Sequence, residues 1–391
     1  MFLAFPEINI YSTPLLFLSL QGLVFVFLLF RRYLQTRYLP DVLLVCILLL
    51  TCYGQTCYTV GFMGWYDTFR NTKINYALFN IGLGLAPLIY LYVKSITRSG
   101  FQLRIKDVLH FLPLILFVLY RIGIYIHDAL QPDFVFVQNG ELKLLVDQVY
   151  VLPMMSYFGY AQMLLYLAFT FQMFIQYRTK LQAYFSNTYD LELNWIRNFL
   201  LLYTFLFCYD ITQSIVQNFF VDLHYTQMWW LVFCSGLTIL YVAIKGYFTD
   251  TSKLNQLKFD FVPEQVASET QESTLSKTIS EQEIEIVKTL MMKEKPYLNP
   301  ELNLVELAKL AEMSRGQLSG IINSGFGKNF NDFVNLYRIE AFKYKVGDDA
   351  HEKLSLMGIA YECGFNSKAT FNRVFKKLTN SSPTEYLKAA I

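Results

Sequence analysis

The sequence has few charged residues for its length and almost no excess of either sign. Lysine, arginine, aspartate and glutamate make up 16% of its 391 residues, with 33 basic side chains balanced by 31 acidic ones. A soluble domain of average composition carries about 25% charged residues. Because the formal net charge is only +2, no global field attracts a polyanion, and any nucleic-acid surface must be local.

Signatures of catalysis, metal binding and disulfide scaffolds are also missing. The four histidines, His110, His127, His224 and His351, share no helical metal-ligand spacing, and no nucleophile elbow, phosphate-binding glycine loop or kinase motif occurs. Five of the six cysteines lie in apolar runs without disulfide or zinc spacing, so we interpret them as packing residues. We therefore predict a protein that is not an enzyme and that needs no metal and no cofactor.

Long apolar runs dominate the first 248 residues. Hydrophobic residues make up 54% of the chain, and runs near or above the about 17–25 residues that cross a bilayer recur until residue 248. Buried helices of a soluble protein would show an amphipathic pattern, which PLLFLSLQGLVFVFLLF lacks. We predict a seven-helix transmembrane bundle in contact with the lipid bilayer, with spans at 8–30, 42–62, 75–96, 108–126, 151–175, 195–219 and 228–248.

Lysine and arginine are distributed asymmetrically among the loops that join these spans. Ten of them follow the first, third and fifth spans, whereas the other loops hold three. Because positive loops stay on the cytoplasmic side, we expect the N-terminus outside and the C-terminus in the cytoplasm of a multi-pass protein of the inner (cytoplasmic) membrane. The first span has basic residues only after it, which is not typical of a cleavable signal peptide.

The composition changes between residues 249 and 279. Ser, Thr, Gln, Glu and Lys replace large apolar residues there, which is typical of a flexible linker that cannot build a core. A coil of this length spans about 30 Å. The linker separates a membrane domain at 1–248 from a domain at 280–391, and it would also allow proteolytic release of that second domain.

The segment 280–391 is dense in helix-start signals and shows no strand pattern. Ser280, Asn303, Ser314 and Ser382 each precede a Glu or Gln by three residues, as an N-cap does. The fold class that we predict for the whole chain is therefore all-α. Apolar periodicity places helices at 281–294, 304–312, 315–323, 330–346, 356–363, 368–378 and 383–389.

Two pairs of these helices share one layout, in which a short helix, a tight turn and a second helix with polar exposed positions follow one another. The pairs are LVELAKLAEMSRGQLSGIIN and LMGIAYECGFNSKATFNRVFKK. This layout is typical of a tandem helix-turn-helix, in which the second helix of each pair enters the major groove of DNA. An ordinary helical bundle with short loops would show similar spacing.

The residues of both pairs fall at a recognisable spacing. The second pair carries Ile359-Ala360, Gly364-Phe365, Ser367, Phe371, Arg373, Phe375-Lys376-Lys377, Pro383 and Tyr386, and the first pair carries Leu307-Ala308, Ser314, Leu318-Ser319, Gly327, Phe330, Phe333 and Arg338-Ile339. This pattern resembles the DNA-binding domain of the AraC/XylS family of bacterial transcription regulators. Ile322, Phe342 and Asn380 depart from it, because the family usually has Phe, Ala and Gly there.

The resemblance covers about 110 residues and implies that promoter or operator double-stranded DNA is a partner. It implies nothing about the first 248 residues, although a multi-span region joined to such a domain is similar to membrane-bound AraC-type regulators.

Polar side chains on the second helix of each pair are the predicted DNA contacts. Asn372 and Arg373 can read base edges, whereas Lys376 and Lys377 suit phosphates. From residue 353 onward six basic residues accompany two acidic ones, a local charge of +4, although a solvated helix face is the alternative. The resemblance implies that the base-facing positions of the first pair are Gly316, Ser319 and Gly320, and because two of them are glycines we expect mainly phosphate contacts there. The full set is Arg315, Gln317, Ser319, Asn323, Lys328, Lys368, Thr370, Asn372, Arg373, Lys376 and Lys377.

Ionisable residues inside a membrane span are costly and therefore suggest function. Arg121 and Asp210 lie at a similar depth, about 21 Å from the cytoplasmic start of their spans at about 1.5 Å per residue. We expect that they could meet, near Gln213 and Gln217, in a ligand or signal site. A pair that only fixes helix packing is an equal alternative, and Arg121 could instead extend outward to the interface.

These features together predict a membrane-bound bacterial transcription regulator that senses a signal in its membrane domain and binds DNA through residues 280–391. The signal would be a ligand or a membrane protein partner. A symmetric DNA site would require a homodimer, whereas direct repeats would not. The competing hypothesis is a membrane receptor or transporter whose cytoplasmic helices bind a protein partner, although no inverted repeat supports transport. A membrane enzyme is the least supported hypothesis.

Overall fold

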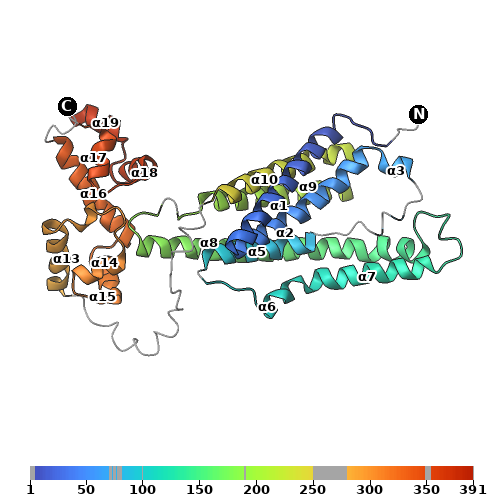
Figure 1. Cartoon of the computed structure of the whole chain (residues 1–391), viewed down its shortest axis with the longest axis horizontal. Coiled ribbons are helices and arrows are strands. Elements are labelled where there is room, and N and C mark those ends of the chain that lie inside the picture. The colour runs from blue at the N-terminus through green and yellow to red at the C-terminus, as the bar shows by residue number, and fades with distance from the viewer. Residues whose placement is uncertain are drawn as a thin grey trace. The chain divides into compact units, whose positions relative to one another are not determined.

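The computed structural model describes residues 5–69, 73, 76, 82–98, 100–188, 191–249, 280–347 and 354–390. Within these ranges the regular elements are helices, together with one isolated β-bridge, so the all-α prediction is confirmed for them (Figure 1). Of the predicted linker 249–279, all but Thr249 lies outside the described residues.

The chain divides into two compact units. The first contains Met1–Phe174 and Asn194–Phe261, and the second contains Ile175–Leu193 and Val262–Ile391. The segment Ile175–Leu193, which the sequence analysis placed in the membrane domain, therefore packs with the C-terminal residues.

Six helical runs in the described residues of the first unit are long and apolar enough to cross a membrane, rather than the seven predicted. The predicted third span corresponds to α5 (Gly82–Thr97), whose 16 residues extend about 24 Å, less than a hydrocarbon core of about 30 Å. Its predicted start at residue 75 lies outside the described residues. The six runs are α1 (Ser12–Thr36), α2 (Leu39–Phe62), Ile105–Ala129 with α6 (Ile105–Val108), η1 (Leu109–Phe111) and α7 (Leu112–Ala129), Lys143–Tyr184 with η2 (Lys143–Val151) and α8 (Leu152–Tyr184), α9 (Asn194–Phe219), and Tyr225–Phe248 with η3 (Tyr225–Met228) and α10 (Trp229–Phe248).

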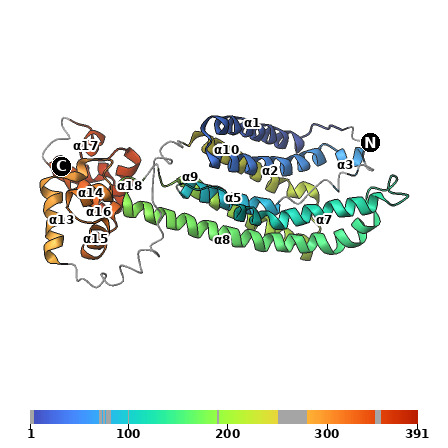
Figure 2. The same ribbon diagram turned by 60° about the horizontal axis from the view of Figure 1, so that its bottom comes forward.

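Helix α2 is central to the first unit, because it packs against α1, α5 and α10. Small residues let these helices approach closely: a Cβ atom at Gly22 of α1 would overlap the Cys52 sulfur, and one at Gly246 of α10 would overlap a Leu44 methyl group. Helix α7 lies beside α8 (Figure 2). A short helix, α3 (Trp65–Thr68), follows α2.

The outer faces of these helices carry large apolar side chains that no protein atom covers. Phe27 is 65% exposed, Leu119 is 58% exposed and Phe205 is 67% exposed. Apolar surface on this scale is unfavourable in water, but it suits contact with lipid chains. The packing of the first unit therefore agrees with the composition of its helices in favouring a multi-pass membrane region.

The second unit contains all seven helices that the sequence predicts for residues 280–391. Their boundaries agree within two residues when the π-helical turn η5 is counted with α15. The elements are α13 (Glu281–Lys293), η4 (Pro296–Leu298), α14 (Leu304–Leu310), α15 (Arg315–Gly320), η5 (Ile321–Gly325), α16 (Phe330–Gly347), α17 (Leu356–Glu362), α18 (Lys368–Thr379) and α19 (Pro383–Ala390).

Side chains at the predicted N-caps satisfy the first amides of these helices. The Asn303 side-chain oxygen accepts a hydrogen bond from the Glu306 N–H at 3.0 Å, and the Glu306 carboxylate accepts one from the Asn303 N–H at 3.4 Å. Ser280, Ser314 and Ser382 cap α13, α15 and α19 in a similar way. Each such cap stabilises its helix by about 1 kcal/mol, so the starts of these helices are determined locally.

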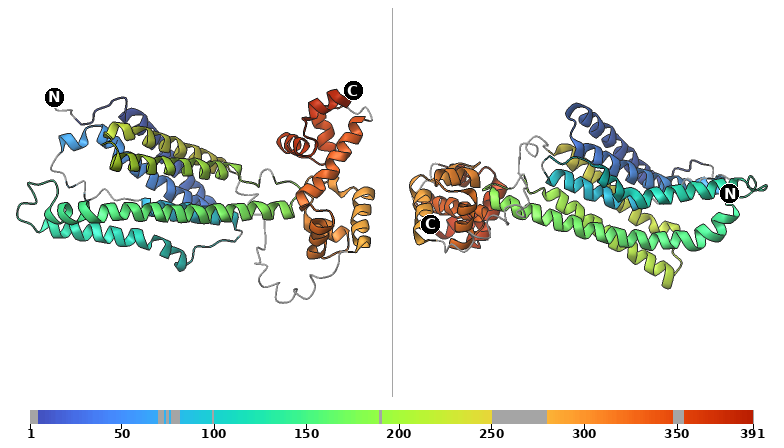
Figure 3. Two further views of the ribbon diagram at one scale, coloured as in Figure 1. Left: turned by 180° about the vertical axis from the view of Figure 1, so that it is seen from behind. Right: turned by 90° about the horizontal axis from the view of Figure 1, so that it is seen from below.

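Helix α16 runs from one helix-turn-helix pair to the other (Figure 3). It contributes to two hydrophobic cores, one for each pair. Phe333, in its first half, belongs to the core of α13, α14 and α15. Phe342, in its second half, belongs to the core of α17, α18 and α19, where its ring lies 4.7 Å from that of Phe371 and 5.5 Å from that of Phe375. Phe342 therefore fills the centre of the second core although it departs from the AraC-type pattern.

Gly364, in the turn between α17 and α18, occupies a position that excludes a side chain. Its φ is +89°, and a Cβ atom there would overlap the Tyr297 carbonyl oxygen and lie 3.0 Å from Arg338 Nε. The second turn is thus packed directly against η4 and α16. By contrast, Asn380 ends α18 with φ of +57°, a left-handed conformation that asparagine adopts readily.

We expect Gly364→Ala to lower the opening free energy of amides in α18 by about 2 kcal/mol, because it adds backbone strain to a steric overlap. Hydrogen–deuterium exchange of the full chain in detergent measures this. Gly358→Ala is the matched control, since its Cβ atom would meet no atom nearer than 3.5 Å. Equal protection in the two variants would contradict the assigned role of Gly364.

Candidate nucleic-acid interface

Helix α18 has one buried and one exposed face. Phe371 is 1% exposed, Val374 is 6% exposed and Phe375 is fully buried, as their spacing predicts. The predicted DNA contacts of this helix that lie on the exposed face are Lys368, Asn372, Arg373, Lys376 and Lys377.

Thr370 does not lie on this face. It is 2% exposed, and its hydroxyl lies 2.8 Å from the hydroxyl of Ser367, whose Oγ also accepts the Thr370 N–H at 3.2 Å. The prediction that Thr370 lies on the exposed face of this helix is therefore wrong. Its position three residues after the N-cap turns the side chain back toward the turn, where it stabilises the start of the helix.

The first pair presents a weaker polar face. Arg315, Gln317 and Asn323 are exposed, whereas Ser319 and Lys328 are half-buried. Gln317 donates a hydrogen bond to the Glu283 carboxylate of α13 at 2.7 Å, and the Arg315 guanidinium lies 5.5 Å from the centre of the Tyr184 ring. Tyr184 is the last residue of α8. The last residue of the apolar run Lys143–Tyr184 thus contacts a predicted DNA-binding residue.

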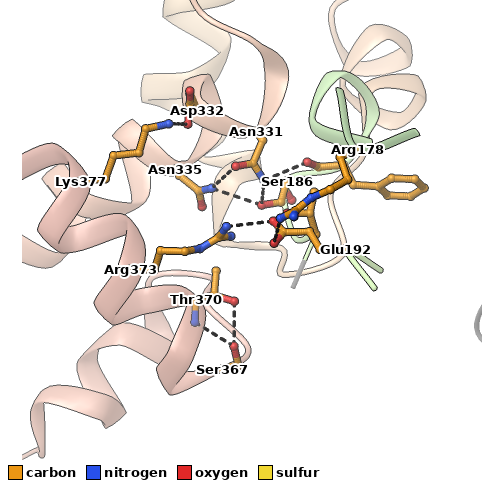
Figure 4. A network of polar contacts seen from close by, with 12 residues as sticks. Arg178, Ser186, Glu192, Asn331, Asp332, Asn335, Ser367, Thr370, Arg373 and Lys377 are labelled. Carbon is orange, nitrogen blue, oxygen red and sulfur yellow. Dashed lines mark hydrogen bonds and ion pairs between the residues drawn. The ribbon is translucent and has the colours of Figure 1, made fainter. Parts of the chain in front are cut away.

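A second residue from the same part of the chain contacts Arg373. The Arg373 guanidinium donates a hydrogen bond to Glu192 Oε1 at 2.9 Å (Figure 4). Glu192 is 2% exposed and also accepts hydrogen bonds from the Thr188 hydroxyl at 2.7 Å and from Arg178 at 2.8 Å. Burial alone would raise the pKa of Glu192, but the Thr188 hydrogen bond and the two guanidinium charges outweigh it and lower that pKa. Glu192 is therefore a carboxylate at neutral pH.

Lys377 is also paired with a carboxylate. Its ammonium group lies 2.6 Å from Asp332 in the first turn of α16 (Figure 4). The Lys377 side chain is 59% exposed, so this pair is weak and easily exchanged for a phosphate.

Behind Glu192, the backbone of Ser186 is inserted into a polar groove of α16. Its carbonyl oxygen accepts hydrogen bonds from Asn331 at 2.9 Å and Asn335 at 3.3 Å (Figure 4). Its hydroxyl accepts one from Arg338 at 3.0 Å. The Ser186 hydroxyl in turn donates to the Leu302 carbonyl at 2.6 Å. Ser186 is fully buried, so the segment 185–193 is an integral part of the second unit.

Arg338 organises this groove. It is fully buried and donates hydrogen bonds at 2.8 Å to the carbonyl oxygens of Tyr297 and Asn299. Burial lowers the pKa of Arg338 to about 10, despite an opposing contribution from Glu301, and the guanidinium stays charged at neutral pH.

Sequence reasoning identified Arg338 as part of the AraC-type pattern but missed Ser186, Thr188 and Glu192. Neither apolar periodicity nor a motif marks those three residues, and the contacts of Ser186 with Arg338 and of Glu192 with Arg373 each join residues more than 100 positions apart. Glu192 stands in a loop that was interpreted as basic, and the acids Asp190 and Glu192 were the available signal there.

In the first unit, Arg121 does not meet Asp210, so that prediction is wrong. Arg121 pairs with Asp147, and the Lys143 ammonium lies 3.2 Å from the same carboxylate. The reason is that η2 extends the fifth run to Lys143, eight residues before the predicted start, and places Asp147 opposite α7. Asp210 instead lies within hydrogen-bonding reach of the Tyr160 hydroxyl.

Of the other residues predicted for this membrane site, Gln213 donates a hydrogen bond to the Gln227 carbonyl at 3.3 Å, and Gln217 is exposed. The structure thus does not bring the four predicted residues together.

Two helix-turn-helix pairs on a shared central helix, with a polar second helix in each pair, define a DNA-binding domain. Comparison with known proteins identifies its class: residues 307–389 match a helix-turn-helix domain family. The C-terminal region therefore contains the AraC-type DNA-binding domain of HTH-type transcriptional regulators.

Several curated relatives match a stretch of 90 residues of this chain. HTH-type transcriptional regulators of Staphylococcus aureus strains COL and MSSA476 are 32% identical over 90 residues, which cover 23% of this chain and 12% of each relative. The probable transcriptional regulator LumQ of Photobacterium leiognathi is 27% identical over 90 residues, 35% of its own length. No solved structure matches the chain. The similarity to these relatives thus covers less than a quarter of this chain and at most about a third of each relative.

We expect Asp147→Asn to destabilise the first unit by about 3–5 kcal/mol, because it leaves the charges of Arg121 and Lys143 buried without their carboxylate. Thermal unfolding in detergent, followed by tryptophan fluorescence, reports on this unit because all four tryptophans lie in it. Asp210→Asn is the control and should lower the midpoint much less. A similar loss in both variants would rule out a special role for Asp147.

Proposed function

We propose that the protein is a membrane-bound bacterial transcription regulator whose AraC-type domain binds promoter DNA sequence-specifically, under the control of a signal received by its apolar helices. The observation that carries this proposal is the exposed face of α18. It presents Asn372, Arg373 and Lys376 from a helix whose opposite face is anchored in an aromatic core.

The side chains of this face are suited to different parts of DNA. Asn372 and Arg373 can form paired hydrogen bonds with the edges of adenine and guanine, which distinguish base pairs in the major groove. Lys376, Lys377 and Arg315 suit phosphates, which supply affinity without sequence information. In this proposal α18 provides most of the specificity, and α15 orients the domain one helical turn, about 34 Å, away.

The contacts of the second unit support a cytoplasmic position for the DNA-binding domain. The segment Ile175–Leu193 contains the last ten residues of α8, with Arg178 and Lys180, and most of the loop to α9, and it packs in the same unit as the domain. Basic residues beside apolar runs favour the cytoplasmic side. In this proposal the domain and the α8–α9 loop lie on the cytoplasmic side, and α9 and α10 cross the membrane out and back.

Control by the membrane helices requires two states with different DNA affinities. A ligand or membrane partner shifts such an equilibrium only through its differential affinity for the two states. The competing function, a receptor or transporter whose cytoplasmic helices bind a protein, predicts no retention of DNA.

The proposal is tested by selecting duplexes from a pool of 40-base-pair DNA with a random core, using the full chain in lipid nanodiscs at low salt. We expect one enriched sequence. Asn372→Ala with Arg373→Ala should reduce its preference over unselected DNA at least tenfold, since each base contact contributes about 1–3 kcal/mol. Lys376→Ala should weaken binding to all duplexes and reduce the salt dependence by about one phosphate contact.

Lys343→Ala is the matched control, because it removes the same charge from α16, outside both predicted recognition helices. It should leave sequence preference unchanged. Failure of the folded full chain to retain any duplex at low salt would exclude DNA binding and favour a protein partner.

A further inference from the structure

One short segment of the chain contacts predicted DNA-binding residues of both helix-turn-helix pairs. Tyr184 lies beneath the Arg315 guanidinium of the first pair, and Glu192 accepts a hydrogen bond from Arg373 of the second. The two residues stand eight positions apart and flank Ser186, which is fixed in the α16 groove. The segment 184–192 is thus positioned to affect both contacts with DNA.

The contact with Glu192 competes directly with base recognition. Glu192 holds one guanidinium nitrogen of Arg373, and the carboxylate is itself fixed by Thr188 and Arg178. Paired recognition of guanine requires two parallel donors from Arg373, and a carboxylate beside them reduces the attraction of this face for DNA. The Arg373 side chain is 44% exposed, so it can leave Glu192 without unfolding the helix.

The segment is also connected to the apolar helices. Helix α8 is continuous from Leu152 to Tyr184, and its last ten residues belong to the second unit. A rotation or shift of α8 would therefore move Ser186 and Glu192. Because Ser186 is hydrogen-bonded to Asn331 and Arg338 of α16, such a movement would reach the DNA-binding domain through this segment.

We propose that the segment 184–192 competes with DNA for Arg373. Glu192 binds the Arg373 guanidinium and keeps it from contacting bases until a movement of α8 carries Glu192 away. This inference rests on the proposed function, because it assigns the regulation of the same site. Ser186 positions the segment through its hydrogen bonds with α16, and Glu192 determines by how much the affinity for DNA is lowered.

The test uses the full chain in nanodiscs and the 40-base-pair duplex that the selection described above enriches, with fluorescence anisotropy as the readout. Glu192→Gln removes the charge and preserves the size of the side chain. We expect it to bind the duplex about fivefold more tightly, in line with the loss of one partly exposed ion pair. Thr188→Val, which removes one of the hydrogen bonds that position the Glu192 carboxylate, should tighten binding about twofold.

Two controls separate competition from a general effect of charge. Glu340→Gln removes a carboxylate of α16 that is paired with Lys343, and it should leave affinity unchanged. In an Arg373→Met background the effect of Glu192→Gln should disappear, because the guanidinium group for which Glu192 competes with DNA is absent. Hydrogen–deuterium exchange of residues 185–188 verifies that the segment stays folded in each variant.

The outcomes are distinguishable from failure of the proposed function. If no duplex is selected, the proposed function fails before this test begins. If a duplex is selected but Glu192→Gln binds it equally or more weakly, Glu192 does not compete and the inference is wrong. An increase in affinity that persists undiminished with Arg373→Met would also overturn it.

Discussion

The second unit depends on one buried cation. Arg338 lies at the centre of α16, where the two hydrophobic cores meet, and donates to carbonyl oxygens of Tyr297 and Asn299 as well as to Ser186. A guanidinium group that is buried away from water needs protein hydrogen-bond acceptors for most of its N–H groups. This requirement fixes η4 against α16 and fixes the segment after α8 against both. The arrangement of the two helix-turn-helix pairs and the docking of the segment are therefore set by a single side chain.

Local signals were sufficient to predict most of the second unit. N-cap residues such as Asn303 and Ser382 determine where helices begin, and apolar spacing determines which faces are buried, so both could be predicted without knowledge of distant contacts. Phe371 and Phe375 lie in the core as expected. Thr370 was misplaced because exposure was inferred from polarity, whereas its hydroxyl is satisfied by Ser367 within the same turn.

Long-range pairing could not be predicted in the same way. Arg121 was expected to meet Asp210 because both were placed at the same depth, but depth does not specify which helices are neighbours or how far each one extends. The π-helical start of the fifth run supplied Asp147 instead. Glu192 and Ser186 were missed for the same reason, because their partners are specified by tertiary packing and not by spacing along the chain.

The continuity of α8 also limits how its length can change. Each residue added to an α-helix turns everything beyond it by about 100° and advances it by about 1.5 Å. One residue inserted between Leu152 and Tyr184 would therefore rotate Ser186 away from the α16 groove or force the apolar part of the helix to rotate instead. Seven inserted residues would nearly restore the angle while lengthening the helix by about 10 Å. Helical phase, and not only distance, thus constrains the connection between the two units.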